Sequence, residues 1–228
     1  MPIATSNTSL KPATPSSIGG KLLNVIATPG DLFDEIVATP SNRETWLVPT
    51  LLVCLTGLLL LPVATAKETA ARATDPVLAF QAERLFGNWR MFSAVATCAA
   101  VFVGTFWSAF VLWFIGRVFL KVRFSYWKSL EVVGLAGIIL ALGSIVTLLL
   151  ILASGQSTAR PALSLFANGP EVGGKIHTLL DLMNCFHLWT TAVLAVGLGK
   201  LSGVSLKESA FWVFGYWVLL RAMLLMLT

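Results

Sequence analysis

The sequence has little charge and few side chains that carry chemistry. Only 12% of its 228 residues are charged, against about 25% in soluble proteins. Its three cysteines, Cys54, Cys98 and Cys185, form no CxxC pair, which argues against a metal site or a disulfide framework. HExxH, GxSxG and P-loop motifs are also absent from the sequence. We therefore expect no metal, no cofactor and no enzymatic activity.

Long apolar runs dominate the chain instead, since 56% of residues are hydrophobic and the mean hydropathy is +0.81. A helix needs about 20 mostly apolar residues to cross about 30 Å of hydrocarbon, and five stretches are long enough. Pro62 should end or kink the first of them. The sequence thus predicts an all-α polytopic membrane protein with a five-helix domain over residues 46–228, whose spans are residues 46–66, 91–120, 129–153, 179–199 and 209–227.

The N-terminal region has a different composition. Residues 1–20 are rich in Ser, Thr, Pro and Gly, which predicts a disordered polar tail. Residues 21–45 form an amphipathic segment in which Thr28 and Pro29 are typical of a helix start. The segment is too short to span, so it either lies in the membrane interface as a wedge or docks on the cytoplasmic ends of the bundle. Its apolar residues are Leu22, Leu23, Val25, Ile26, Leu32, Phe33, Ile36 and Val37.

Basic residues predict the orientation of the chain. Lysine and arginine are more frequent in the loops on the N-terminal side of the predicted spans, and residues 116–128, GRVFLKVRFSYWK, contain four of them without an acid. The positive-inside rule therefore predicts a cytoplasmic N-terminus and a C-terminus outside. The same loop suits anionic lipid of the cytoplasmic leaflet. Because the basic residues lie in short loops between apolar runs, we expect no nucleic-acid partner.

Small residues recur at helical spacing in two predicted spans, where they allow helices to approach closely. Each stripe predicts either a contact inside the bundle or the face of a homo-oligomer, and the sequence alone does not separate the two. The residues are Ala96, Ala100, Gly104 and Ser108 in the second span, and Gly134, Gly137, Ala141 and Ser144 in the third.

Few ionisable residues lie within the predicted spans, and each needs a partner, because a charge near mid-bilayer costs about 2.5–3.5 kcal/mol. We expect Glu131 to pair with Lys128 or Arg117 at the cytoplasmic surface. Asp181 and Arg221 lie near the same side of the membrane, which predicts an interhelical ion pair between them. Snorkelling of Arg221 to the interface is the alternative.

His177, Asp181 and Cys185 are spaced i, i+4, i+8 and share one face of a predicted helix. Metal ligands or a proton relay can have this spacing. However, a metal site needs three or four convergent ligands, and His187 lies on another face while no second helix offers a matching acid or histidine. We therefore expect no metal centre and no proton relay here.

Two blocks resemble the Yip family of Rab/Ypt-interacting membrane proteins: NVIATPGDLFDEIVATP, residues 24–40, and LLDLMNCFHLWTTAVLAVGLGKLSGVSLKESAFWVFGYW, residues 179–217. The resemblance covers about residues 21–228. It implies five transmembrane helices with a cytoplasmic N-terminus and a C-terminus on the other side. The chain lacks the long acidic N-terminal region and the DLYGP-type signature of eukaryotic members. It therefore matches the prokaryotic branch better, which implies the inner membrane of a prokaryotic cell and argues against small-GTPase binding.

Two functions are consistent with these features. The first is a non-catalytic membrane-shaping, trafficking or scaffold protein that uses the amphipathic segment as a wedge or docking surface. The alternative is a small solute or ion transporter or channel, which would need polar residues at the midplane or broken helices. The expected partners are the lipid bilayer, a second copy of the chain or other membrane proteins.

Overall fold

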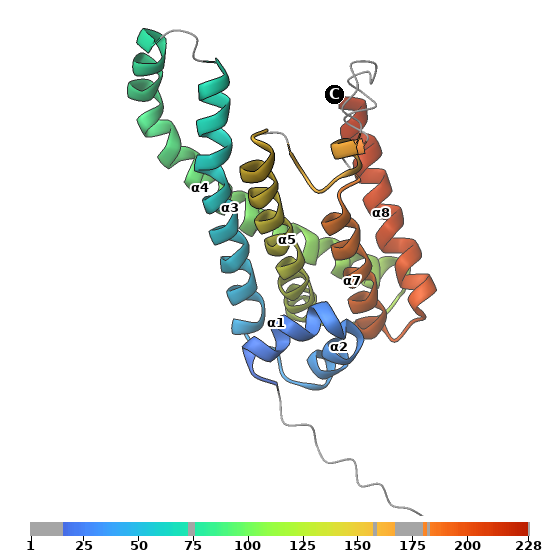
Figure 1. Ribbon diagram of the computed structural model, residues 1–228. Coiled ribbons are helices and arrows are strands. Elements are labelled where there is room, and N and C mark those ends of the chain that lie inside the picture. Colours follow the sequence, from blue (N-terminus) through green and yellow to red (C-terminus); the bar gives the residue numbers. More distant parts are fainter. Residues whose placement is uncertain (1–15, 73–75, 157–158, 167–179, 182, 228) are drawn as a thin grey trace, which may run out of the picture.

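A computed structural model describes residues 16–72, 76–156, 159–166, 180–181 and 183–227. Helices α3, α5, α7 and α8 run along the molecule, with α4 passing behind them and α1 and α2 lying across one end (Figure 1). We call this the cap end and the opposite one, where α8 finishes, the far end. The elements are α1 (Ile18–Ala27), α2 (Pro29–Ala38), α3 (Glu44–Arg72), α4 (Pro76–Phe114), η1 (Ile115–Phe119), α5 (Tyr126–Ser154), η2 (Leu163–Phe166), α7 (Cys185–Ser202) and α8 (Leu206–Leu227).

The predicted all-α architecture is confirmed for these residues, whereas the predicted number of five spans is not. Among the described residues, three helical segments are long and apolar enough to cross a membrane: Glu44–Val63, Met91–Phe119 and Tyr126–Ser154. Helices α7 and α8 are not in this set. Helix α7 has only 18 residues, which is about 27 Å of helix, and it contains His187 and Lys200. Five crossings therefore remain a prediction.

Several predicted boundaries differ from the observed ones. Helix α3 runs through Pro62 and ends at Arg72, so that proline does not end the helix. The fourth predicted span starts late, at Cys185, because Asn184 is extended and its side chain accepts a hydrogen bond from the Phe186 N–H as an N-cap. The predicted polar tail is shorter than expected, since α1 begins at Ile18. Residues 1–15 of that tail lie outside the described residues.

The third-span stripe of small residues forms a helix contact inside the bundle. Gly134 lies against α3 so closely that a Cβ there would be 2.6 Å from the Cα of Trp46. Gly137 faces Val53 of α3, and Ala141 is buried. Such close backbone approach is the role of small residues between membrane helices, so Gly134, Gly137 and Ala141 belong to the core; Ser144, further along, is half-buried and lines a cavity.

The second-span stripe lies elsewhere. Ala96, Ala100 and Gly104 are exposed on α4, and Ser108 is half-buried. A Cβ added at Gly104 would meet nothing within 4 Å. This stripe therefore does not pack inside the bundle, whereas Ala109 and Leu112, further along α4, are buried. Helix α4 contacts the core mainly through its last turns.

Candidate functional site

The cap consists of α1 and α2, which meet at a sharp break. Thr28 ends α1 and precedes α2, and Pro29 occupies the first position of α2. Proline is favoured there, because the first N–H groups of a helix have no intrahelical partner and the ring fixes a helical φ. The helix start predicted at this site is confirmed, although the Thr28 side chain makes no capping hydrogen bond.

The apolar face of the cap is turned toward the bundle. Val25, Leu32, Phe33 and Ile36 are at most 1% exposed and belong to the main hydrophobic cluster, with Leu22 and Ile26 packed at its edge. Only Leu23 and Val37 of the predicted wedge residues are exposed, at 70% and 46%. Most of the wedge face is therefore covered by protein, in the docked arrangement that was the alternative to a helix lying in lipid.

A half-buried lysine, Lys128, joins the cap to α5. The Lys128 Nζ donates to the backbone oxygens of Ile36 and Thr39, each at 2.6 Å, and lies 3.1 Å from Glu131 Oε2. Cations are favoured at helix C-termini, where the last carbonyl groups lack partners. Glu131 is 2% exposed and also accepts a hydrogen bond from the backbone N–H of Asn42. The pairing of Glu131 with Lys128 is thus confirmed, and the two side chains hold the end of α2 and the following turn.

Further polar contacts connect the elements of the cap end. Glu35 of α2 accepts from the backbone N–H and the hydroxyl of Ser16, at 2.9 and 2.7 Å, and lies 3.8 Å from Lys21 of α1. Asp34 pairs with Lys200 of α7 at 2.5 Å. The acids of α2 therefore link it both to α1 and to the bundle. No pattern in the sequence predicts the partners of Glu35, because they depend on how α1 folds back on α2.

The basic segment between α4 and α5 also lies at the cap end. Arg117, Lys121 and Arg123 are exposed, and the Arg117 guanidinium lies 5.5 Å from the Trp113 ring centroid in a cation–π contact. Lys121 has a φ of 55°, a left-handed conformation that non-glycine residues adopt rarely. The backbone thus turns sharply here and leaves three cations facing outward.

At the far end, the structure does not form the predicted ion pair between Asp181 and Arg221. Asp181 instead lies 3.8 Å from Arg160 and accepts a hydrogen bond of 3.0 Å from the Ser164 hydroxyl. Arg221 lies over the Trp217 ring at 5.5 Å, and its Nε is buried without a hydrogen-bond partner in the described part of the chain. The sequence prediction missed Arg160 because this residue precedes η2 in a connection with no helical periodicity.

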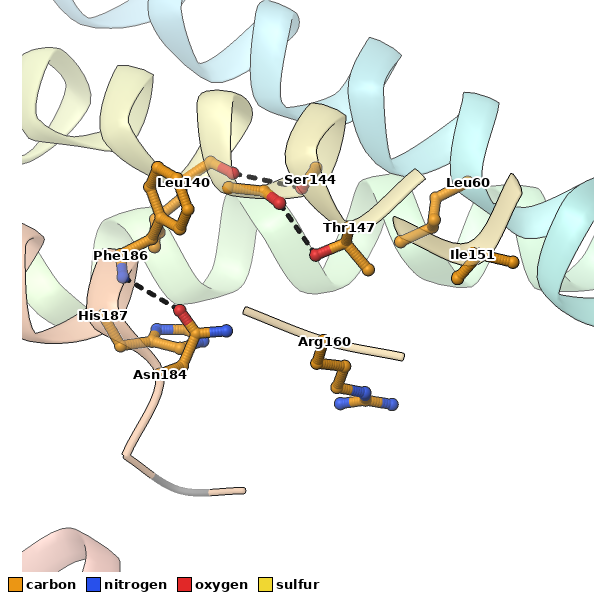
Figure 2. A pocket seen from close by; sticks show the side chains of 10 residues that line it. Leu60, Leu140, Ser144, Thr147, Ile151, Arg160, Asn184, Phe186 and His187 are labelled. Atoms are coloured by element: carbon orange, nitrogen blue, oxygen red, sulfur yellow. Dashed lines mark hydrogen bonds between the residues drawn. The ribbon is translucent and has the colours of Figure 1, made fainter. Parts of the chain in front are cut away.

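A cavity of about 270 Å³ lies beside this ion pair, between α3, α5 and α7. Figure 2 shows Arg160, Asn184 and His187 on one side of it, opposite the hydroxyl-bearing face of α5 formed by Ser144 and Thr147. His177 lies outside the described residues. No group of three potential metal ligands occurs among the residues that the structure describes, and Cys185 is exposed.

Comparison with known proteins identifies the family. The family model described as the Yip1 domain matches residues 23–228, which is nearly the whole chain. Searches of curated proteins and of solved structures found no match. The match covers α2 to α8 and the second half of α1, so it includes both the cap and the bundle. Together with the long apolar helices, it points to an integral membrane protein. The chain therefore belongs to the Yip1 domain family.

Proposed function

We propose that this protein is a non-catalytic membrane-shaping or trafficking scaffold that presents α1 and α2 as a fixed platform on the cytoplasmic end of its helix bundle. The observation that carries this proposal is the covered apolar face of the cap, with Phe33 and Val25 fully buried. A helix pair held this way is a rigid surface rather than a freely inserting wedge. Its outward residues, Asp31, Leu23 and Val37, are available to partners.

The charge at the cap end supports a cytoplasmic orientation. Arg117, Lys121 and Arg123 are exposed beside the platform, and each such cation contributes about 1 kcal/mol of attraction to an anionic membrane surface. Contact with anionic lipid of the cytoplasmic leaflet follows from this placement. In a prokaryotic cell this leaflet belongs to the inner membrane.

The exposed stripe on α4 supports a protein partner within the membrane. Ala96, Ala100 and Gly104 leave a shallow helix face that a helix of a second copy, or of another membrane protein, could approach closely. Small-GTPase binding is not part of the proposal.

Reconstitution into liposomes containing anionic lipid tests the proposed function. The purified protein should change the distribution of vesicle diameters in cryo-electron micrographs while ion and solute flux stay at the protein-free level. Lys128→Met, which loosens the cap, should weaken the shape change, whereas Lys207→Met at an exposed site should leave it intact. Vesicles of unchanged shape at every protein density would contradict membrane shaping.

A transporter or channel is the second candidate, and the far-end cavity is the observation that favours it. Its polar lining, which includes Ser144, Thr147 and Asn184, provides the kind of groups that a solute site needs. The same reconstitution decides between the two functions. Solute flux well above background in the wild type would contradict the scaffold and support transport.

A further inference from the structure

The far-end cavity has two kinds of lining. Arg160, Asn184 and His187 give it a polar side, and Leu60, Leu140 and Ile151 give it an apolar side. Figure 2 shows Arg160 across the cavity from α5 and the amide nitrogen of Asn184 turned toward the Arg160 side. A site of this kind fits a ligand that is itself part polar and part apolar.

Arg160 and Asn184 on the polar side offer hydrogen-bond donors to the cavity. The Asn184 Oδ1 accepts from the Phe186 N–H at 2.9 Å, which leaves the amide nitrogen to donate into the cavity. Arg160 carries five N–H donors and lies 3.8 Å from Asp181, which is beyond hydrogen-bond distance. The hydroxyls of Ser144 and Thr147 already donate to backbone oxygens, at 3.1 and 2.8 Å. The donors of Arg160 and Asn184 therefore select an acceptor-rich group.

Among the described lining residues, the charged side chain is a cation. None of these residues is acidic, and the side chain of Arg160 is 60% exposed at the edge of the cavity. Arg221 is a second cation close enough to interact electrostatically with His187, and its buried Nε has no partner in the described part of the chain. An anion is favoured here, because its charge would balance two guanidinium groups of which Asp181 compensates only one.

The size of the cavity limits what can enter it. A volume of about 270 Å³ corresponds to about nine water molecules at about 30 Å³ each, and lies just below the range of about 300–1,000 Å³ typical of complete small-molecule sites. A phosphate or carboxylate with the first carbons of a chain would fit. The apolar side of the cavity, formed by Leu60, Leu140 and Ile151, can take those first carbons.

We propose that this cavity binds the anionic head of an amphiphile, a phosphate or carboxylate held by Arg160 and Asn184, while the first carbons of its chain lie against Leu60, Leu140 and Ile151. The site lies at the opposite end of the bundle from the cap and does not depend on the scaffold function. The bound lipid would come from the membrane leaflet that surrounds the far end of the bundle.

Native mass spectrometry of the full-length protein in an uncharged detergent tests this site. The protein is titrated with phosphatidylglycerol, with phosphatidylcholine of the same acyl chains, and with inorganic phosphate. We expect phosphatidylglycerol to bind at least tenfold more tightly than phosphatidylcholine, which is about 1.4 kcal/mol. Millimolar inorganic phosphate should not displace it. Equal binding of the two lipids, or displacement by free phosphate, would overturn the proposal.

Variants assign the binding to the cavity. Arg160→Gln should weaken phosphatidylglycerol binding about tenfold, and Ser144→Leu, which fills the cavity from α5, should weaken it at least as much. Lys207→Gln is the matched control, because it removes one exposed charge at the cap end, and it should bind like the wild type. Unchanged binding in Arg160→Gln, or an equal loss in Lys207→Gln, would show that the lipid binds elsewhere.

Discussion

At the scale of single residues, Lys128 is the residue on which the cap depends most. Its Nζ contacts two backbone oxygens at the end of α2 and the carboxylate of Glu131, and the side chain is 14% exposed. The sequence predicted that Glu131 pairs with Lys128 or Arg117, and the structure selects Lys128, its neighbour at i and i+3 on the helix. The bonds to Ile36 and Thr39 were not predictable, since those carbonyl groups are about 90 residues away in the chain.

We expect Lys128→Met to lower the stability of the protein by about 3–5 kcal/mol, the usual cost of removing one partner of a buried ion pair. Glu131 would keep its bond from Asn42 but lose its compensating charge. The thermal unfolding midpoint in detergent measures the loss. Adding Glu131→Gln to this variant should recover part of it, because the uncompensated charge is gone.

Lys207→Met serves as the control for this variant, because Lys207 is exposed at the start of α8. It should change the midpoint little. If Lys128→Met unfolded at the wild-type temperature, the lysine would not hold the cap.

At the scale of helices, glycine positions decide how closely α5 and α7 approach. A Cβ at Gly197 of α7 would lie 2.3 Å from a methyl group of Val132 and 3.3 Å from the ring of Phe33. Gly197→Ala should therefore destabilise the protein by about 1–3 kcal/mol through overpacking, and it should disturb the cap through Phe33. Thermal unfolding in detergent, with limited proteolysis of the cap, measures both effects.

Gly215→Ala is the matched substitution on α8, where an added Cβ would meet nothing within 4 Å. It should be neutral or stabilising by up to about 1 kcal/mol, because alanine favours helix more than glycine does. Equal destabilisation by the two substitutions would contradict the close contact between α5 and α7.

Helical periodicity predicted the apolar face of the cap but not what covers it. Leu32, Phe33 and Ile36 have the same spacing whether the covering surface is lipid or protein, so only the packing against Val132 and Gly197 separates the two arrangements. The stripes of small residues likewise do not show from their spacing what covers them. Gly134 and Ala96 both belong to stripes of small residues at helical spacing, yet the first is buried against Trp46 and the second is exposed.

At the scale of the whole molecule, composition predicted the helical membrane class, because long apolar runs with few charges suit no other environment. Composition does not predict which polar side chains from distant segments contact each other. Asp181 pairs with Arg160 rather than with Arg221, since the connection after α5 returns to the start of α7 and forms a bridge between Ala162 and Asn184. A prediction based on helix positions alone does not include the path of this connection between α5 and α7.

We expect α7 and α8 to cross the membrane together with the three longer spans, so that the cap and the α7–α8 turn lie on one side. Ser17→Cys in the cap, Gln156→Cys after α5 and Ser205→Cys between α7 and α8 all place a thiol at an exposed site. In a background without Cys54, Cys98 and Cys185, these variants can be labelled on intact cells with a membrane-impermeant maleimide. The account predicts labelling of Gln156→Cys alone, and of all three variants after the membrane is opened. Labelling of Ser205→Cys together with Gln156→Cys on intact cells would contradict it, because α7 would then not cross the membrane.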